Sequence, residues 1–273
     1  MPDEVDVYRD WLGIKEPDRP LSYYQLLRLS RFEDDAAKIR EHYRKMNAHV
    51  RKYSTGQYAK KSQALLNELA RAMLCLTDAR RKTEYDASMG RTSSAESGTA
   101  SLEQLLLGSK AVTTADLDKA RTFASAVGFE VRDALMQQKI VPAEVVMQAY
   151  ADSVGLPFIQ LSETPLDDDL IAKLPATLAR LHSCVPVMVD EGQLLVASPN
   201  LLSPQVEEEL RLRLDMPVRS LICTPSEIND VINDKYSREA ASAQLAGKSI
   251  VRTSDDEEER ESWWDKLKSR LGG

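Results

Sequence analysis

The sequence predicts a mostly α-helical protein with a small α/β part: a helical hairpin, then a helical repeat, then a ββαβα segment. Two amphipathic patterns of helical period within residues 36–77 predict the hairpin. A self-similarity with an offset of 29 residues predicts the repeat within 101–161. Two strand-like apolar runs joined by Asp190-Glu191-Gly192 predict the first strands of the last segment.

The chain of 273 residues is long enough for two domains. Residues 91–100, RTSSAESGTA, are small and polar, which is typical of a linker. Residues 1–90 hold 17 basic and 14 acidic side chains, a net charge of +3, whereas residues 101–238 hold 12 and 20, a net charge of −8. We therefore expect a first module over 1–90 and a second domain over 101–238, made of a repeat (101–161) and an α/β subdomain (162–238), with different partners.

The first module begins with a capping box, Ser22 with Gln25, that opens a short helix over YYQLLRL. Two amphipathic helices follow at about 36–53 and 57–77. Since each helix needs a partner for its apolar face, an antiparallel hairpin is the expected fold.

Residues 20–88 resemble a J domain, above all in the closing stretch LTDARRKTEYD at 76–86. The resemblance implies a helical hairpin that stimulates a heat-shock ATPase chaperone through a His-Pro-Asp loop. The matching residues here are His49-Val50-Arg51, which lack the helix-breaking proline and reverse the acidic charge. We therefore expect a degenerate J-like fold, keep a J-type co-chaperone as an alternative, and regard His49 and Arg51 as weaker candidates for partner contact.

The basic side chains of this module predict a solvated face or a surface for an acidic protein partner. Nucleic acid is not expected, because the net charge is only +3 and no nucleic-acid-reading motif is present. A metal centre is not expected either, since the cysteines and histidines form no CxxC or HxxxH spacing. Cys75, Cys184 and Cys223 each lie in an apolar run, which predicts buried thiols.

The repeat aligns LLGSKAVTTADLDKA with LMQQKIVPAEVVMQA, and each unit is predicted to be a short helix, a tight turn and a second helix. Three pairs of apolar residues match across it: Val112 with Val141, Leu117 with Val146, and Ala120 with Ala149. A capping box, Thr113 with Asp116, opens the second helix of the first unit, and Pro142 stands near the corresponding start in the second. We expect the two units to share one core.

In the α/β subdomain, Ser203 and Pro204 predict the start of a helix over about 204–214. The run MPVRSLICT predicts a third strand. The sequence Thr224-Pro225-Ser226-Glu227 combines a capping box with a proline at the first helical position, and it predicts a last helix.

Residues 101–238 resemble the N-terminal domain of type II secretion and type IV pilus assembly ATPases, the bacterial protein E family. The most specific stretches are VGLPFIQL, IAKLPATLARLHSCVPV and EGQLLVASPN. The resemblance implies a domain that docks an ATPase on an inner-membrane platform. In some members of the family it also binds cyclic di-GMP through two tandem motifs.

Those cyclic di-GMP motifs resemble Arg-Leu-Gly-Glu followed by a Gly-Leu-Ile-Thr turn. The matching positions are 101–104 and 110–113 in the first unit, and 130–133 and 139–142 in the second; the arginine and both glycines of the motif are missing from each. Cyclic di-GMP is therefore an alternative rather than the expected cofactor. The ligand surface that the resemblance implies consists of apolar residues: Leu102, Leu106, Leu117, Leu135 and Val146.

Residues 239–273 predict a disordered acidic tail that ends in a short amphipathic motif. Its apolar residues are Trp263, Trp264, Leu267 and Leu271. We expect these four to bind a partner groove as a peptide helix. Folding back on the chain's own domain and docking on a membrane surface are the alternatives.

No pattern predicts a catalytic site. The Gly-Lys-Ser in SAQLAGKS (242–249) lacks the first glycine and the preceding strand of a phosphate-binding loop, so no ATPase core is expected. No signal peptide or membrane span is predicted, and we expect a cytoplasmic protein. The sequence therefore predicts a non-enzymatic adaptor or scaffold whose protein partner belongs to a secretion or pilus assembly machine, with a cyclic di-GMP sensor as the main alternative.

Overall fold

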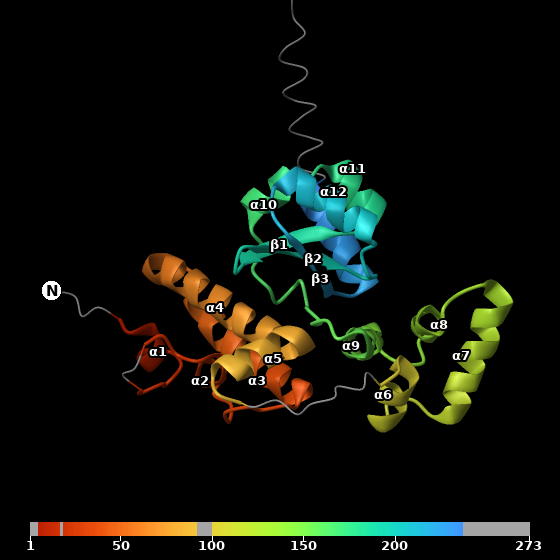
Figure 1. Ribbon diagram of the computed structural model, residues 1–273, viewed down its shortest axis with the longest axis horizontal. Helices are drawn as coiled ribbons and strands as arrows, with labels where there is room; N and C mark the ends of the chain where they lie inside the picture. Colours follow the sequence, from red (N-terminus) through yellow and green to blue (C-terminus); the bar gives the residue numbers. More distant parts are fainter. Residues whose placement is uncertain (1–4, 17–18, 92–99, 237–273) are drawn as a thin grey trace, which may run out of the picture. The chain divides into compact units, whose positions relative to one another are not determined.

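Helices form most of the computed structural model, which describes residues 5–16, 19–91 and 100–236, and a three-stranded sheet completes it (Figure 1). The chain divides into two units, residues 1–231 and 232–273, and the features below belong to the first unit except for residues 232–236 of the last helix. The prediction of a mostly helical protein with a small α/β part is confirmed. Among the described residues, no helix is both long enough and apolar enough to cross a bilayer.

Within its described residues, the first module has five α-helices: α1 (Val7–Asp10), α2 (Tyr23–Leu26), α3 (Ala36–Val50), α4 (Ala59–Thr77) and α5 (Ala79–Ser88). Helices α3 and α4 pack on each other as the expected hairpin, with Ser62 Oγ donating to Val50 O at 3.0 Å. The predicted helix over 36–53 is shorter than expected, because the chain tightens into a 3₁₀ turn after Val50. The absence of a proline there does not prolong the α-helix.

The stretch LTDARRKTEYD contains a helix boundary at Asp78. Asp78 has extended backbone angles, φ −92° and ψ 119°, so α4 ends at Thr77. Its carboxylate accepts the Arg81 backbone N–H at 2.9 Å and so caps α5.

The Tyr-Asp end of this stretch fastens α5 to α2. Asp86 is 3% exposed and accepts hydrogen bonds from Tyr24 Oη at 2.5 Å and Lys82 Nζ at 2.7 Å. Burial, together with the hydrogen bond to Asp86, raises the pKa of Tyr24 well above its ordinary value. Tyr23 stacks on Tyr85 with ring centroids 4.6 Å apart. These contacts join α2, which precedes the α3–α4 hairpin, to α5, which follows it. The assignment to the J-domain family stays a prediction.

The repeat folds as two helix–turn–helix units: α6 (Leu102–Gly108) with α7 (Thr114–Val127), and α8 (Val131–Gln137) with α9 (Ala143–Val154). Helix α8 begins 29 residues after α6, and α9 begins 29 residues after α7, as the sequence offset predicts. The capping box of Thr113 and Asp116 is present, and Pro142 is the residue before α9. The predicted shared core is also present, and it is described with the site below.

From β1 onward the α/β subdomain follows the predicted ββαβα order, and two short helices precede it. Its elements are α10 (Asp168–Lys173), α11 (Ala176–His182), β1 (Val185–Asp190), β2 (Gln193–Ser198), α12 (Pro204–Leu214), β3 (Val218–Ile222) and a helix over 225–236. The strand order is β1-β2-β3, with β1 antiparallel and β3 parallel to β2. Glu191 and Gly192 both have positive φ, 49° and 76°, as a two-residue type I′ hairpin turn requires.

Candidate functional site

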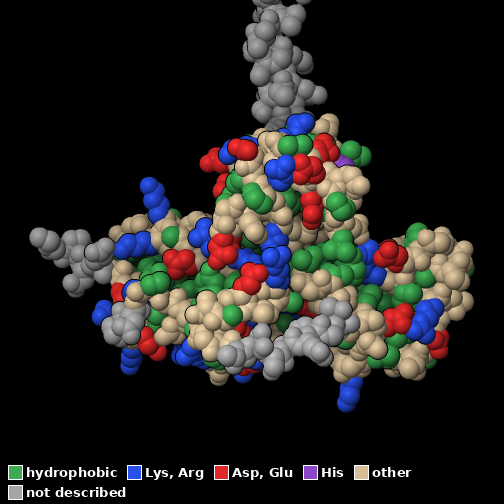
Figure 2. Space-filling model, viewed as in Figure 1, with side chains coloured by type: hydrophobic (Ala, Val, Ile, Leu, Met, Phe, Trp, Pro, Cys, Tyr) green, Lys and Arg blue, Asp and Glu red, His purple; other side chains and the backbone are tan. Residues whose placement is uncertain are grey.

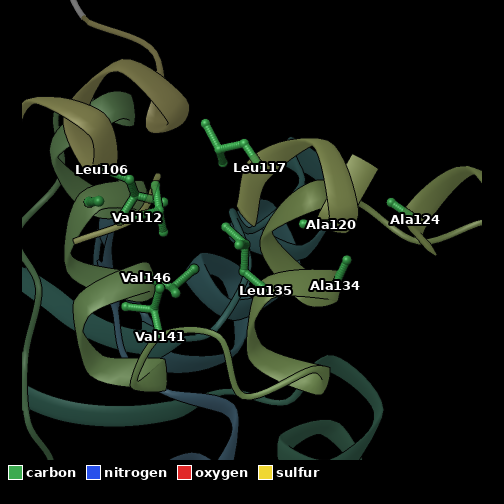
Figure 3. Packing of buried hydrophobic residues seen from close by; sticks show 10 residues of the cluster. Leu106, Val112, Leu117, Ala120, Ala124, Ala134, Leu135, Val141 and Val146 are labelled. Carbon is green, nitrogen blue, oxygen red and sulfur yellow. The ribbon is translucent and has the colours of Figure 1, made fainter. Parts of the chain in front are cut away.

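The apolar residues predicted as a ligand surface lie in the core that the two repeat units share (Figure 3). Leu106, Leu117, Leu135 and Val146 are between 0% and 2% exposed, and Leu102 packs against them partly buried. The four buried side chains contact one another across the units, so their packing accounts for their residue types. Their role as a ligand surface stays a prediction.

The turn of each repeat unit keeps a backbone shape that favours glycine. Lys110 has φ 56° and Lys139 has φ 53°, and both stand where the cyclic di-GMP motif has a glycine. A side chain in the left-handed region costs roughly 1–2 kcal/mol. The turns therefore retain the glycine conformation although the glycines are absent.

A cavity of about 250 Å³ opens beside the second unit, where Arg132 occupies another motif-glycine position. Arg132 is 7% exposed, and its Nη2 donates to Asn200 Oδ1 at 2.8 Å. Its guanidinium lies 4.4 Å from the centroid of the Tyr150 ring, a cation–π geometry. Asp133 lines the same cavity. The Asp133 carboxylate accepts a hydrogen bond from Arg132 Nε at 3.2 Å, so the cavity is lined by a guanidinium and a carboxylate that pair with each other.

The sequence analysis missed Arg132, which it treated only as a departure from the motif. The signal was available, since an arginine in an otherwise apolar or acidic helix start is a candidate for phosphate or amide recognition. The distant partner was not available from sequence, because Asn200 lies on a loop after β2, 68 residues further along the chain.

Arg51, one of the two weaker partner candidates, is engaged within the chain. Its Nη2 donates to Ser162 O at 3.2 Å, and its Nε donates to Asn47 Oδ1 at 2.8 Å. His49 is half-buried, with its ring 5.9 Å from that of Tyr53. The tail candidates Trp263, Trp264, Leu267 and Leu271 lie outside the described residues, so their role in partner binding stays a prediction.

Four charged residues join α5 to the sheet, and we name them the hairpin network: Asp78, Arg81, Asp190 and Arg219. Asp78 is fully buried and accepts from Arg219 Nε at 2.7 Å. Arg81 pairs with Asp190, and these two side chains are 8% and 5% exposed. Figure 2 shows basic and acidic side chains next to one another in the central part of its view. Since burying charges is favourable only when they are paired, each residue of the network depends on its partner in the other module.

The described residues contain no group of three or more His, Cys, Asp and Glu side chains that could hold a metal. The three cysteines are buried and unpaired with one another, which confirms the prediction of buried thiols. Burial raises the pKa of both the Cys75 thiol and the Cys184 thiol to about 12, so neither forms a thiolate near neutral pH.

Residues 154–242 match the MshEN domain. The bacteriophage adsorption protein B of Escherichia coli K12 and the bacteriophage N4 adsorption protein B of Escherichia coli O157:H7 are each 25% identical over 137 residues, which is 50% of this chain. The chain spans only 18% of the length of these curated relatives.

Two solved structures are also similar. The structure of MshE with cdg is 22% identical, with a TM-score of 0.44, and the match covers 50% of this chain and 99% of that one. The N-terminal domain of XpsE is 21% identical, with a TM-score of 0.38, covering 48% and 91%. The family match supports, for residues 154–242, the resemblance to the N-terminal domain of type II secretion and type IV pilus ATPases, and residues 101–153, which form most of the repeat, lie outside the match.

Proposed function

We propose that the protein is a non-enzymatic adaptor whose second domain docks on a component of a secretion or pilus assembly machine. The observation that supports this function is the match of residues 154–242 to the MshEN domain. The hairpin network adds support, because it bonds this domain to a helical module of different charge. An adaptor needs two binding surfaces in one molecule, and the two modules can supply one each.

Cross-linking from the exposed apolar side chains of the second domain tests the docking. Leu181 on α11, Leu201 on the loop after β2 and Leu212 on α12 are 72%, 50% and 69% exposed. A photoreactive residue at each position, in the full chain in its native cells, should give discrete adducts with an assembly-machine component. The matched control is the exposed Lys60 at the start of α4. Adducts no different from those of the control at all three positions would count against docking.

An assay of ATP hydrolysis tests the non-enzymatic part of the proposal. The purified chain should hydrolyse ATP no faster than the buffer alone. Hydrolysis above that level that increases in proportion to the protein concentration would contradict it.

A cyclic di-GMP sensor is the second candidate, and the cavity at Arg132 favours it. That cavity lies beside the repeat unit whose Lys139 turn keeps the glycine-like conformation. Calorimetric titration of cyclic di-GMP into the full chain separates the two functions. Micromolar binding that Arg132→Ala abolishes would replace the adaptor by a sensor, whereas no heat at millimolar ligand would exclude the sensor.

A further inference from the structure

One face of α3 carries side chains that donate hydrogen bonds across the module boundary. The spacing of four, three and four residues places them on one stripe of the helix. We name this set the donor stripe: Arg40, Arg44, Asn47 and Arg51. It is built almost wholly from guanidinium groups, which prefer carboxylates and other oxygen acceptors.

The donor stripe is occupied by residues 152–163, which comprise the last turn of α9 and the segment that follows it. Four hydrogen bonds join the two: Arg40 Nη2 to Asp152 Oδ1 (2.5 Å), Arg44 Nε to Gln160 Oε1 (3.0 Å), Asn47 Nδ2 to Glu163 O (3.0 Å) and Arg51 Nη2 to Ser162 O (3.2 Å). Every acceptor is an oxygen of residues 152–163, and two of these residues are acidic. The second domain therefore presents an acceptor-rich segment to a donor-rich helix.

The contact has an exposed half, made by Arg44 and Arg51, and a buried half, made by Arg40 and Asn47. The side chains of Arg44 and Glu163 are 44% and 39% exposed and lie 3.7 Å apart, so solvent and salt screen their attraction. Arg40 and Asn47 differ, since these residues are 5% and 2% exposed. Contacts between modules of one chain resemble transient protein interfaces, so relative motion of the two modules is expected where their interface is not large and apolar.

We propose that the donor stripe is a binding surface for an acidic segment of a partner protein, and that residues 152–163 cover it until that partner binds. An acidic segment offers the stripe the same oxygen acceptors with more negative charge than Gln160 and the Ser162 carbonyl supply. The hairpin network shares no residue with the donor stripe. It holds the two modules together, so it controls the access of a partner to the donor stripe. This inference goes beyond the proposed function, because it concerns the first module and not the second domain.

The test measures binding of a fluorescein-labelled polyglutamate peptide to the full chain by fluorescence anisotropy at low salt. Asp190→Asn removes the carboxylate charge that pairs with Arg81, which weakens the contact between the modules and leaves the donor stripe unchanged. Because the stripe is then more accessible, this variant should bind the peptide roughly tenfold more tightly than the unmodified chain. Arg219→Gln, which loses the contact with Asp78, is a second release variant should Asp190→Asn fail to fold.

Two double variants assign the gain to the stripe. Arg44→Ala with Arg51→Ala, placed in the release background, should abolish the tighter binding. Lys45→Ala with Lys52→Ala removes the same charge from side chains outside the stripe and should retain most of it. The proposal would be overturned if both double variants lost peptide affinity to the same extent. It would also be overturned if the release variants bound the peptide no more tightly than the unmodified chain. Failure of docking by the second domain would appear in the cross-linking assay instead.

Discussion

The two repeat units have the same backbone plan and different surroundings. Leu106 in the first unit and Leu135 in the second are both fully buried, and they match across the 29-residue offset. Outside the core the match ends. Glu103 makes an exposed ion pair with Arg121, whereas Arg132 at the matching position is 7% exposed and bonded to the loop after β2. The comparison shows that the pattern of apolar core residues determines the fold of a repeat unit. The contacts of its surface residues depend on which other elements pack against the unit.

Truncating the core should have the largest effect and should be similar in the two units. Leu106→Ala and Leu135→Ala each leave a cavity in the shared core, so each should lower the free energy of unfolding by about 2–5 kcal/mol. Denaturant titration measures this, with the exposed Leu212→Ala as a control that should change it by less than about 0.5 kcal/mol. A large loss in one unit alone would show that the units have separate cores.

Removing the side chains that differ should have a smaller and unequal effect. Arg132→Ala loses the hydrogen bond to Asn200 and the contact with the Tyr150 ring, so we expect a loss of about 1–3 kcal/mol in the free energy of unfolding. Glu103→Ala removes a surface ion pair and should cost no more than about 1 kcal/mol. Equal losses at these positions would contradict the difference in surroundings.

Restoring glycine at the two turns should have the smallest effect, and it should be stabilising. Lys110→Gly and Lys139→Gly remove the strain of a positive φ but add freedom to the unfolded chain, so the net gain should be below about 1 kcal/mol each. Lys119→Gly within α7 is the matched control and should cost about 1 kcal/mol. A loss of stability at the turns, measured by thermal unfolding, would mean that the lysine side chains make contacts that outweigh the strain.

Local patterns predicted the elements well because the signals lie within a few residues. The capping boxes at Ser22 and Thr113, the turn at Glu191-Gly192 and the repeat offset were all readable from the sequence and are present in the structure. Each depends on backbone preferences or on helical spacing. Both are properties of a short segment.

The candidate sites were less predictable, because their partners lie far away in the sequence. Asp78 was read only as part of the J-domain-like stretch at 76–86, yet it caps a new helix and pairs with Arg219, 141 residues away. Arg51 was considered for an external partner, and its contact with Ser162 depends on how the second domain packs. No local signal contains such information.

The hairpin network has a practical consequence for anyone who divides the chain. A cut within residues 91–100 would separate Asp78 and Arg81 from their partners Arg219 and Asp190. Each fragment would then carry two charges without a counterpart at a surface that is buried in the intact chain. Fragment studies would therefore understate the stability of both halves, and fragments mixed in solution would be expected to reassemble through the same four side chains.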